Sequence, residues 1–66
     1  MANLTDLIIA HPEITSFEDL ESLVAEVGRC GEVLLSLDIR PDYRDTPRAW
    51  QQRLELAFYG SGRRNA

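Results

Sequence analysis

The strongest pattern in the chain is a helical spacing of apolar residues between positions 16 and 37. On a helical wheel of about 100° per residue, the apolar positions of this stretch fall within one arc of roughly 160°. They are Phe17, Leu20, Leu23, Val24, Val27, Cys30, Gly31, Leu34, Leu35 and Leu37. Ser16 followed by Asp19 has the spacing of an N-terminal capping box. We therefore predict one long amphipathic helix over residues 16–37, with the thiol of Cys30 inert on its apolar face.

Two features of this stretch leave alternatives open. A strand is indicated by the alternation of apolar with more polar positions at Val33, Leu35, Leu37 and Ile39. Gly28 and Gly31 each disfavour a helix by about 1 kcal/mol relative to alanine. Residues 28–31 are therefore the weak point of the predicted helix, and a turn there would produce a helix-turn-helix outline.

A short helix is predicted before the long one, over residues 3–11. Leu4, Leu7 and Ile8 fall on one side of it, and Asn3 or Thr5 can cap its start. Pro12 ends it, because the residue before a proline is pushed out of the helical region.

A third helix is predicted over residues 46–59. Thr46 is suited to the N-cap position and Pro47 to the first helical position. Gly60 is suited to the C-terminal stop. The apolar seam of this helix consists of Trp50, Leu54, Ala57 and Phe58.

These elements predict an all-α fold, a small three-helix domain over residues 1–60 followed by a disordered basic tail over residues 61–66. The ten apolar positions of the long helix must be covered either by the two short helices, in a closed monomeric three-helix bundle, or by a second subunit. Part of the apolar arc has the 3-4-3-4-3 spacing of heptads. That part is Phe17, Leu20, Val24, Val27, Gly31 and Leu34. We therefore predict that the chain forms a homodimer along this seam, because small domains without disulfides or metals often gain their core by association.

Charge is distributed unevenly along the 66 residues, whose net charge is −4. Residues 1–28 carry six acidic and no basic side chains, whereas residues 29–66 carry seven arginines against five acidic side chains, so the halves are −6 and +2. The single cysteine excludes a disulfide scaffold. No apolar run is long enough to span a membrane and no signal-peptide pattern is present, so we expect a cytoplasmic protein.

Catalytic and metal-binding patterns are missing from the sequence. His11 and Cys30 are the only histidine and the only cysteine, and His11 precedes a proline at a helix end, where a capping or surface role is expected. No zinc or calcium spacing and no phosphate-binding loop occurs. We predict that the chain is not an enzyme and holds no cofactor or metal.

The preferred hypothesis is a module that binds another protein. The polar side of the long helix carries a predicted acidic face of Glu18, Glu21, Glu26 and Glu32, which suits a partner with a basic surface. In size, charge and predicted helicity the chain resembles small acidic inhibitors of bacteriophages and mobile elements, such as anti-CRISPR and anti-restriction proteins. That resemblance implies an inhibitor or adaptor. Its candidate anchors, if exposed, are Trp50, Leu56 and Tyr59.

The alternative hypothesis is a small helix-turn-helix-like regulator that binds DNA. Its basic patch lies within residues 40–53 and interleaves arginines with aromatic residues: Arg40, Tyr43, Arg44, Arg48, Trp50 and Arg53. Phosphate attraction supplies much of the affinity for DNA, and a net charge of −4 opposes it. Direct binding of nucleic acid is therefore the less favoured hypothesis.

Overall fold

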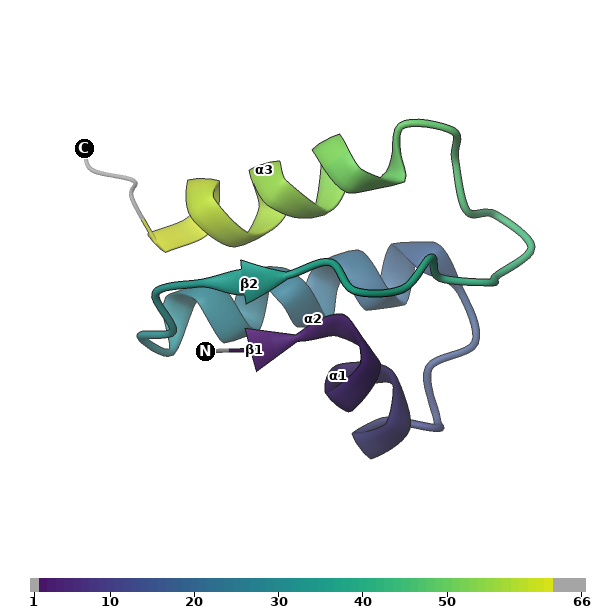
Figure 1. Ribbon diagram of the computed structural model, residues 1–66, viewed down its shortest axis with the longest axis horizontal. Helices are drawn as coiled ribbons and strands as arrows, with labels where there is room; N and C mark the ends of the chain where they lie inside the picture. The colour runs from purple at the N-terminus through teal and green to yellow at the C-terminus, as the bar shows by residue number, and fades with distance from the viewer. Residues whose placement is uncertain (1, 63–66) are drawn as a thin grey trace.

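The computed structural model describes residues 2–62, which form three helices and a two-stranded sheet (Figure 1). In chain order the elements are β1 (Ala2–Asn3), α1 (Leu4–Ala10), α2 (Phe17–Arg29), β2 (Leu35–Ser36) and α3 (Trp50–Gly62). The predicted three-helix, mainly α-helical fold is therefore confirmed, and the small sheet is an addition to it.

The first helix, α1, begins and ends close to the predicted positions. The side-chain oxygen of Asn3 accepts a hydrogen bond from the backbone N–H of Asp6 at 2.8 Å, so Asn3 is the N-cap. The helix ends at Ala10, and His11 is its C-cap. Pro12 follows directly, which confirms the predicted stop.

The second helix, α2, starts where the capping box predicts but ends early. Ser16 Oγ accepts a hydrogen bond from the backbone N–H of Asp19 at 3.1 Å, as expected. At the other end the helix stops at Arg29, and Gly31 adopts a φ of +101°. This conformation suits glycine and is common just after a helix. The prediction of one helix to residue 37 is wrong because the chain turns at its predicted weak point.

Residues 32–37 contain a short strand and no helix. Leu35 and Ser36 form β2, which pairs in parallel with β1 in the register Ala2 to Leu35 and Asn3 to Ser36. The backbone N–H of Ala2 also donates to the carbonyl of Leu34 at 3.0 Å. The strand alternative for this segment is therefore the better prediction, and the helix-turn-helix outline lacks its second helix.

The third helix, α3, begins at Trp50 rather than after Thr46. The Thr46 hydroxyl accepts a hydrogen bond from the backbone N–H of Tyr43 at 3.0 Å. The backbone N–H of Thr46 donates to the Tyr43 carbonyl at 3.2 Å. The predicted cap residue therefore closes a turn before the helix, which is why the helix starts later than its local signal indicates.

The end of α3 also differs from the prediction. The helix continues through Gly60 to Gly62, because a single glycine costs a helix only about 1 kcal/mol and does not end it alone. Residues 61 and 62, predicted to belong to the tail, are thus helical, and the rest of that tail, residues 63–66, lies outside the described residues.

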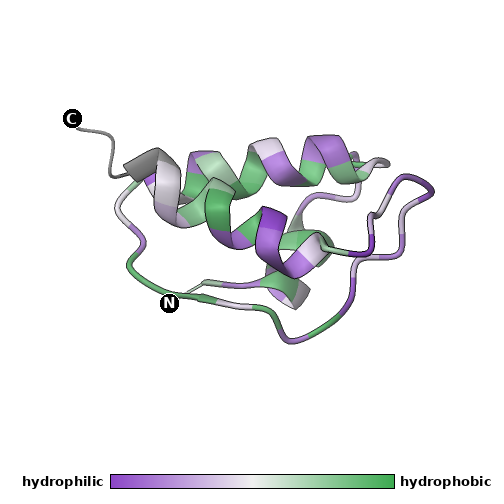
Figure 2. Cartoon of the chain, turned by 90° about the horizontal axis from the view of Figure 1, so that it is seen from above, coloured by the Kyte–Doolittle hydropathy of each residue, from purple (hydrophilic) through white to green (hydrophobic). Residues whose placement is uncertain are grey.

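The hydrophobic core lies mainly between α2 and α3, with one side chain from α1. These two helices lie side by side and run in the same direction, because residues 30–49, which connect them, return along the length of the molecule (Figure 1). Seen from above, hydrophobic and hydrophilic positions alternate along both helices (Figure 2). The hydrophobic core cluster consists of the buried residues Leu4, Phe17, Leu20, Val24, Leu54 and Phe58.

The predicted seam of the third helix is confirmed by this core. Leu54 and Phe58 are buried, and Trp50 and Ala57 are partly buried and pack against the same cluster. The seam was assigned from helical spacing alone, so the inner face of α3 follows directly from the positions of its apolar residues.

Candidate functional site

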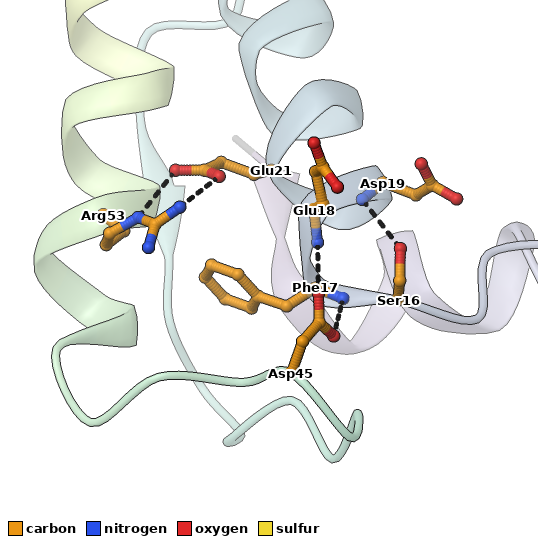
Figure 3. A network of polar contacts seen from close by, with 7 residues as sticks. All are labelled: Ser16, Phe17, Glu18, Asp19, Glu21, Asp45 and Arg53. Atoms are coloured by element: carbon orange, nitrogen blue, oxygen red, sulfur yellow. Dashed lines mark hydrogen bonds and ion pairs between the residues drawn. The ribbon is translucent and has the colours of Figure 1, made fainter.

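The acidic face predicted on the second helix is divided between exposed and paired side chains. Glu18 is exposed, whereas Glu21 is half-buried and directed toward α3 (Figure 3). The Glu21 carboxylate accepts two hydrogen bonds from Arg53, one from Nε at 3.0 Å and one from Nη2 at 2.9 Å. Bidentate pairing of this kind combines geometric specificity with strength. Glu21 therefore joins α2 to α3 and is not a free surface charge.

The other two acidic-face residues do not complete a row of free carboxylates. Glu26 is exposed but forms an ion pair with Arg29 on the same helix. Glu32 is exposed and lies beyond the end of α2. The four glutamates are therefore not aligned along one helix, and their role in binding a partner stays a prediction.

Arg53 holds the first turns of α2 and α3 together by two contacts. Besides its bond to Glu21, its guanidinium carbon lies 5.6 Å from the centre of the Phe17 ring, within range of a cation–π contact. The hydrogen bond and the charge of Glu21 raise the pKa of Arg53. This member of the predicted basic patch is thus committed to an intramolecular contact.

The predicted self-association seam separates into a covered group and an uncovered group. Gly31 and Leu34 follow the helix and are exposed, Leu34 to 56% of its full surface. The remaining members pack into the chain's own core, three of them buried and the last partly buried: Phe17, Leu20, Val24 and Val27. The core of a single chain therefore covers most of this seam, and the homodimer stays a prediction.

Two of the three candidate anchors are exposed on α3. Leu56 is 70% exposed and Tyr59 is 41% exposed, whereas Trp50 is half-buried against the core. The ring of Tyr59 meets that of Phe58 edge to face, with centroids 4.8 Å apart and planes at 89°. α3 therefore carries apolar side chains on its inner face and also on its outer one.

The rest of the predicted basic patch lies on the loop that precedes α3. Arg40, Arg44 and Arg48 are exposed, and within residues 2–62 none of them forms an ion pair. The aromatic members are less accessible, since Tyr43 and Trp50 are partly buried against the core. Burial raises the pKa of the Tyr43 phenol. The patch is therefore three free arginines without freely exposed aromatic partners.

Two carboxylates that the sequence reasoning did not single out, Asp38 and Asp45, cap helices. Asp38 caps α1. Asp38 Oδ1 accepts hydrogen bonds from the backbone N–H groups of Leu4 at 3.1 Å and Thr5 at 3.2 Å. Its Oδ2 accepts a third from the Thr5 hydroxyl at 2.6 Å. This hydroxyl bond, followed by those from the amides, lowers the pKa of Asp38.

The second carboxylate, Asp45, caps α2 in the same way (Figure 3). It accepts hydrogen bonds from the backbone N–H of Phe17 at 2.6 Å and that of Glu18 at 3.2 Å. These bonds to the helix N-terminus, that of Phe17 foremost, lower the pKa of Asp45. Ser16 and Asp45 together therefore satisfy three of the amide groups that a helix start leaves unpaired.

His11 and Cys30 lie at the C-terminal ends of two different helices, α1 and α2. His11 caps α1 as predicted, and its ring Nδ1 is 3.1 Å from Glu13 Oε2. Its own backbone N–H and then His11 lower the pKa of Glu13. Cys30 follows α2 and is exposed, so its predicted place on an apolar helix face is wrong because the helix ends before it.

In residues 2–62 no three histidine, cysteine or carboxylate side chains come together in a group that could hold a metal ion. Among the helices of the same residues, none has the length and apolar character needed to cross a bilayer.

Comparison with known proteins adds no further assignment. No family model, no curated protein and no solved structure matches this chain.

Proposed function

We propose that the chain is a non-enzymatic protein-binding module that acts as an inhibitor or adaptor and docks through the outer face of α3. The observation that carries this proposal is the exposure of Leu56 and Tyr59 on that face. An isolated surface helix normally carries polar residues opposite its core side. Apolar side chains on both sides of α3 therefore favour a second contact beyond the chain's own core.

The arrangement of these two side chains suits an interface. Leu56 and Tyr59 are three residues apart on a helix, so their side chains are neighbours on its surface. The edge-to-face contact with Phe58 limits the orientations of the Tyr59 ring before any partner arrives. A tyrosine that is partly ordered in advance loses less entropy on binding, and tyrosine is enriched among the residues that dominate interface energies.

The experiment compares substitutions at two equally exposed apolar positions. Leu56 and Ile9 are each 70% exposed, on α3 and α1 respectively. The full chain, immobilised, is used to capture proteins from an extract of the source cells, and the variants Leu56→Asp, Tyr59→Ala and Ile9→Asp are compared with it. We expect the first two variants to lose the captured partner and Ile9→Asp to retain it. Retention by Leu56→Asp, or equal loss by Ile9→Asp, would contradict docking through α3.

A further inference from the structure

We propose that the loop of residues 37–49 is a second binding surface, which recognises an acidic segment of another protein through Arg40, Arg44 and Arg48. This surface uses different side chains from the outer face of α3 and does not depend on it. The loop connects β2 to α3 and runs along the molecule to the end where α2 and α3 both begin (Figure 1).

Two of the three acidic side chains of the loop already have hydrogen-bond partners within the chain, although they remain exposed. In sequence the loop is neutral, since three aspartates alternate with three arginines over residues 38–48. In the structure two of those aspartates, Asp38 and Asp45, accept hydrogen bonds from the backbone amides at the starts of α1 and α2. The positive ends of those helices compensate the two negative charges.

Whereas two aspartates of the loop cap helices, its arginines form no ion pair with the described residues. Arg40, Arg44 and Arg48 are exposed, and no carboxylate within residues 2–62 pairs with them. Of the loop aspartates only Asp42 is not used as a helix cap, so the charge offered to a partner is three positive against one negative. The fold thus converts a segment of balanced charge into a basic surface.

The surroundings of this surface favour discrete carboxylates over a nucleic-acid backbone. Glu18 and Asp19 are exposed on the first turn of α2, which Asp45 joins to the loop. These charges, together with Asp42 and the net charge of −4, repel a continuous row of phosphates. Guanidinium groups pair with single carboxylates in bidentate fashion, so a few glutamates on a flexible segment can reach them separately.

The test titrates the isotope-labelled full chain with three probes and follows its arginine Nε–H signals by NMR at low salt. The probes are a twelve-residue glutamate-rich peptide, a glutamine-rich peptide of the same length and a twelve-base-pair DNA duplex. We expect the glutamate-rich peptide to shift the signals of Arg40, Arg44 and Arg48, and the glutamine-rich peptide to leave them unchanged. A tighter association with the duplex than with the glutamate-rich peptide would overturn the proposal, as would unshifted loop signals.

Two triple variants separate the contribution of the loop arginines to binding from the contribution of the net charge. The variant with Arg40, Arg44 and Arg48 all changed to glutamine is expected to bind the glutamate-rich peptide at least tenfold more weakly, with an unchanged thermal midpoint because these side chains are exposed. The matched control changes Arg29, Arg63 and Arg64 to glutamine, which removes the same charge elsewhere. It is expected to keep most of the affinity, and an equal loss in both variants would show that binding follows net charge alone.

Discussion

Replacing Leu54 with alanine tests the packing of the core between α2 and α3 directly. Leu54 has no exposed surface and lies in the cluster that includes Phe17, Leu20 and Phe58. Truncating such a leucine removes its buried methyl groups and leaves a cavity, which together cost about 2–5 kcal/mol. A chain of 66 residues has a total stability of about 3–10 kcal/mol, so this single change removes much of it or all of it.

The matched control is the neighbouring leucine on the other face of the same helix. Leu56 is 70% exposed, and its replacement by alanine is expected to change the free energy of unfolding by less than about 0.5 kcal/mol. Both variants remove the same atoms from the same helix, so propensity effects cancel in the comparison. The difference between their free energies of unfolding therefore measures the contribution of burying the side chain.

Thermal and urea unfolding followed by circular dichroism measure this difference. For a domain of this size each 1 kcal/mol shifts the melting temperature by about 4–8 °C, so Leu54→Ala is expected to melt at least about 8 °C below the parent chain or not to fold. Leu56→Ala is expected to melt within a few degrees of it. Equal destabilisation by the two variants would refute the assignment of Leu54 to the buried inner face of α3. A loss of less than about 1 kcal/mol in the free energy of unfolding for Leu54→Ala would refute it as well.

Three further predictions concern the pH dependence of stability, the turn at Gly31 and the oligomeric state. The lowered pKa values of Asp38 and Asp45 mean that their contribution to stability is present above the unfolded pKa of about 4 and is lost as the pH falls below it. Changing both to asparagine should flatten the urea midpoint against pH in that range, and an unchanged acid slope would contradict the capping roles. Gly31→Ala should lower the free energy of unfolding by about 1–2 kcal/mol, because φ is +101° there. Gly60→Ala, within α3, should raise it by about 1 kcal/mol. A change of the same sign in both variants would be evidence against a left-handed turn at Gly31. The homodimer predicts a mass of twice 7.5 kDa by light scattering at micromolar concentration, and a 7.5 kDa species alone would rule it out.

The starts of the first two helices and the inner face of the third could be read from the sequence because their causes are local. Asn3 and Ser16 each bond an amide three residues ahead, and Pro12 acts on the residue before it. The core spacing of α3 likewise depends only on its own residues. The end of α2 was predicted wrongly because the apolar residues after Gly31 continue the helical phase, which favoured a helix over the strand alternative. Pairing with β1, which no local pattern encodes, selects the strand.

The candidate surfaces depend on contacts between distant residues, and for that reason they were predicted only in part. Leu56 and Tyr59 were identifiable as apolar positions off the core seam of their own helix. The loop arginines were visible as a patch, but their freedom depends on where the neighbouring aspartates go. Asp38 binds amides 33 and 34 residues away, and Asp45 binds amides 27 and 28 residues away. No local pattern encodes those distances.

These distant caps also connect the stability of the fold with the character of its surface. An aspartate that caps a helix is held by backbone amides, which every sequence provides, whereas an arginine has no equivalent backbone partner at a helix start. A loop of alternating aspartates and arginines placed against two helix N-termini therefore engages two of its three acidic side chains, Asp38 and Asp45, with helix amides, although both remain exposed. The same contacts leave Arg40, Arg44 and Arg48 without a partner in residues 2–62. Changing Asp38 and Asp45 to asparagine tests this connection. The loop would lose its hold on α1 and α2 at every pH only if the neutral amide oxygen of asparagine capped a helix no better than a side chain without an acceptor. Asparagine keeps one acceptor oxygen at each site and caps helices well, so the folded loop and its basic surface should both persist in that variant. At position 45 one of the two amide bonds is lost, because the carboxylate uses both of its oxygens there.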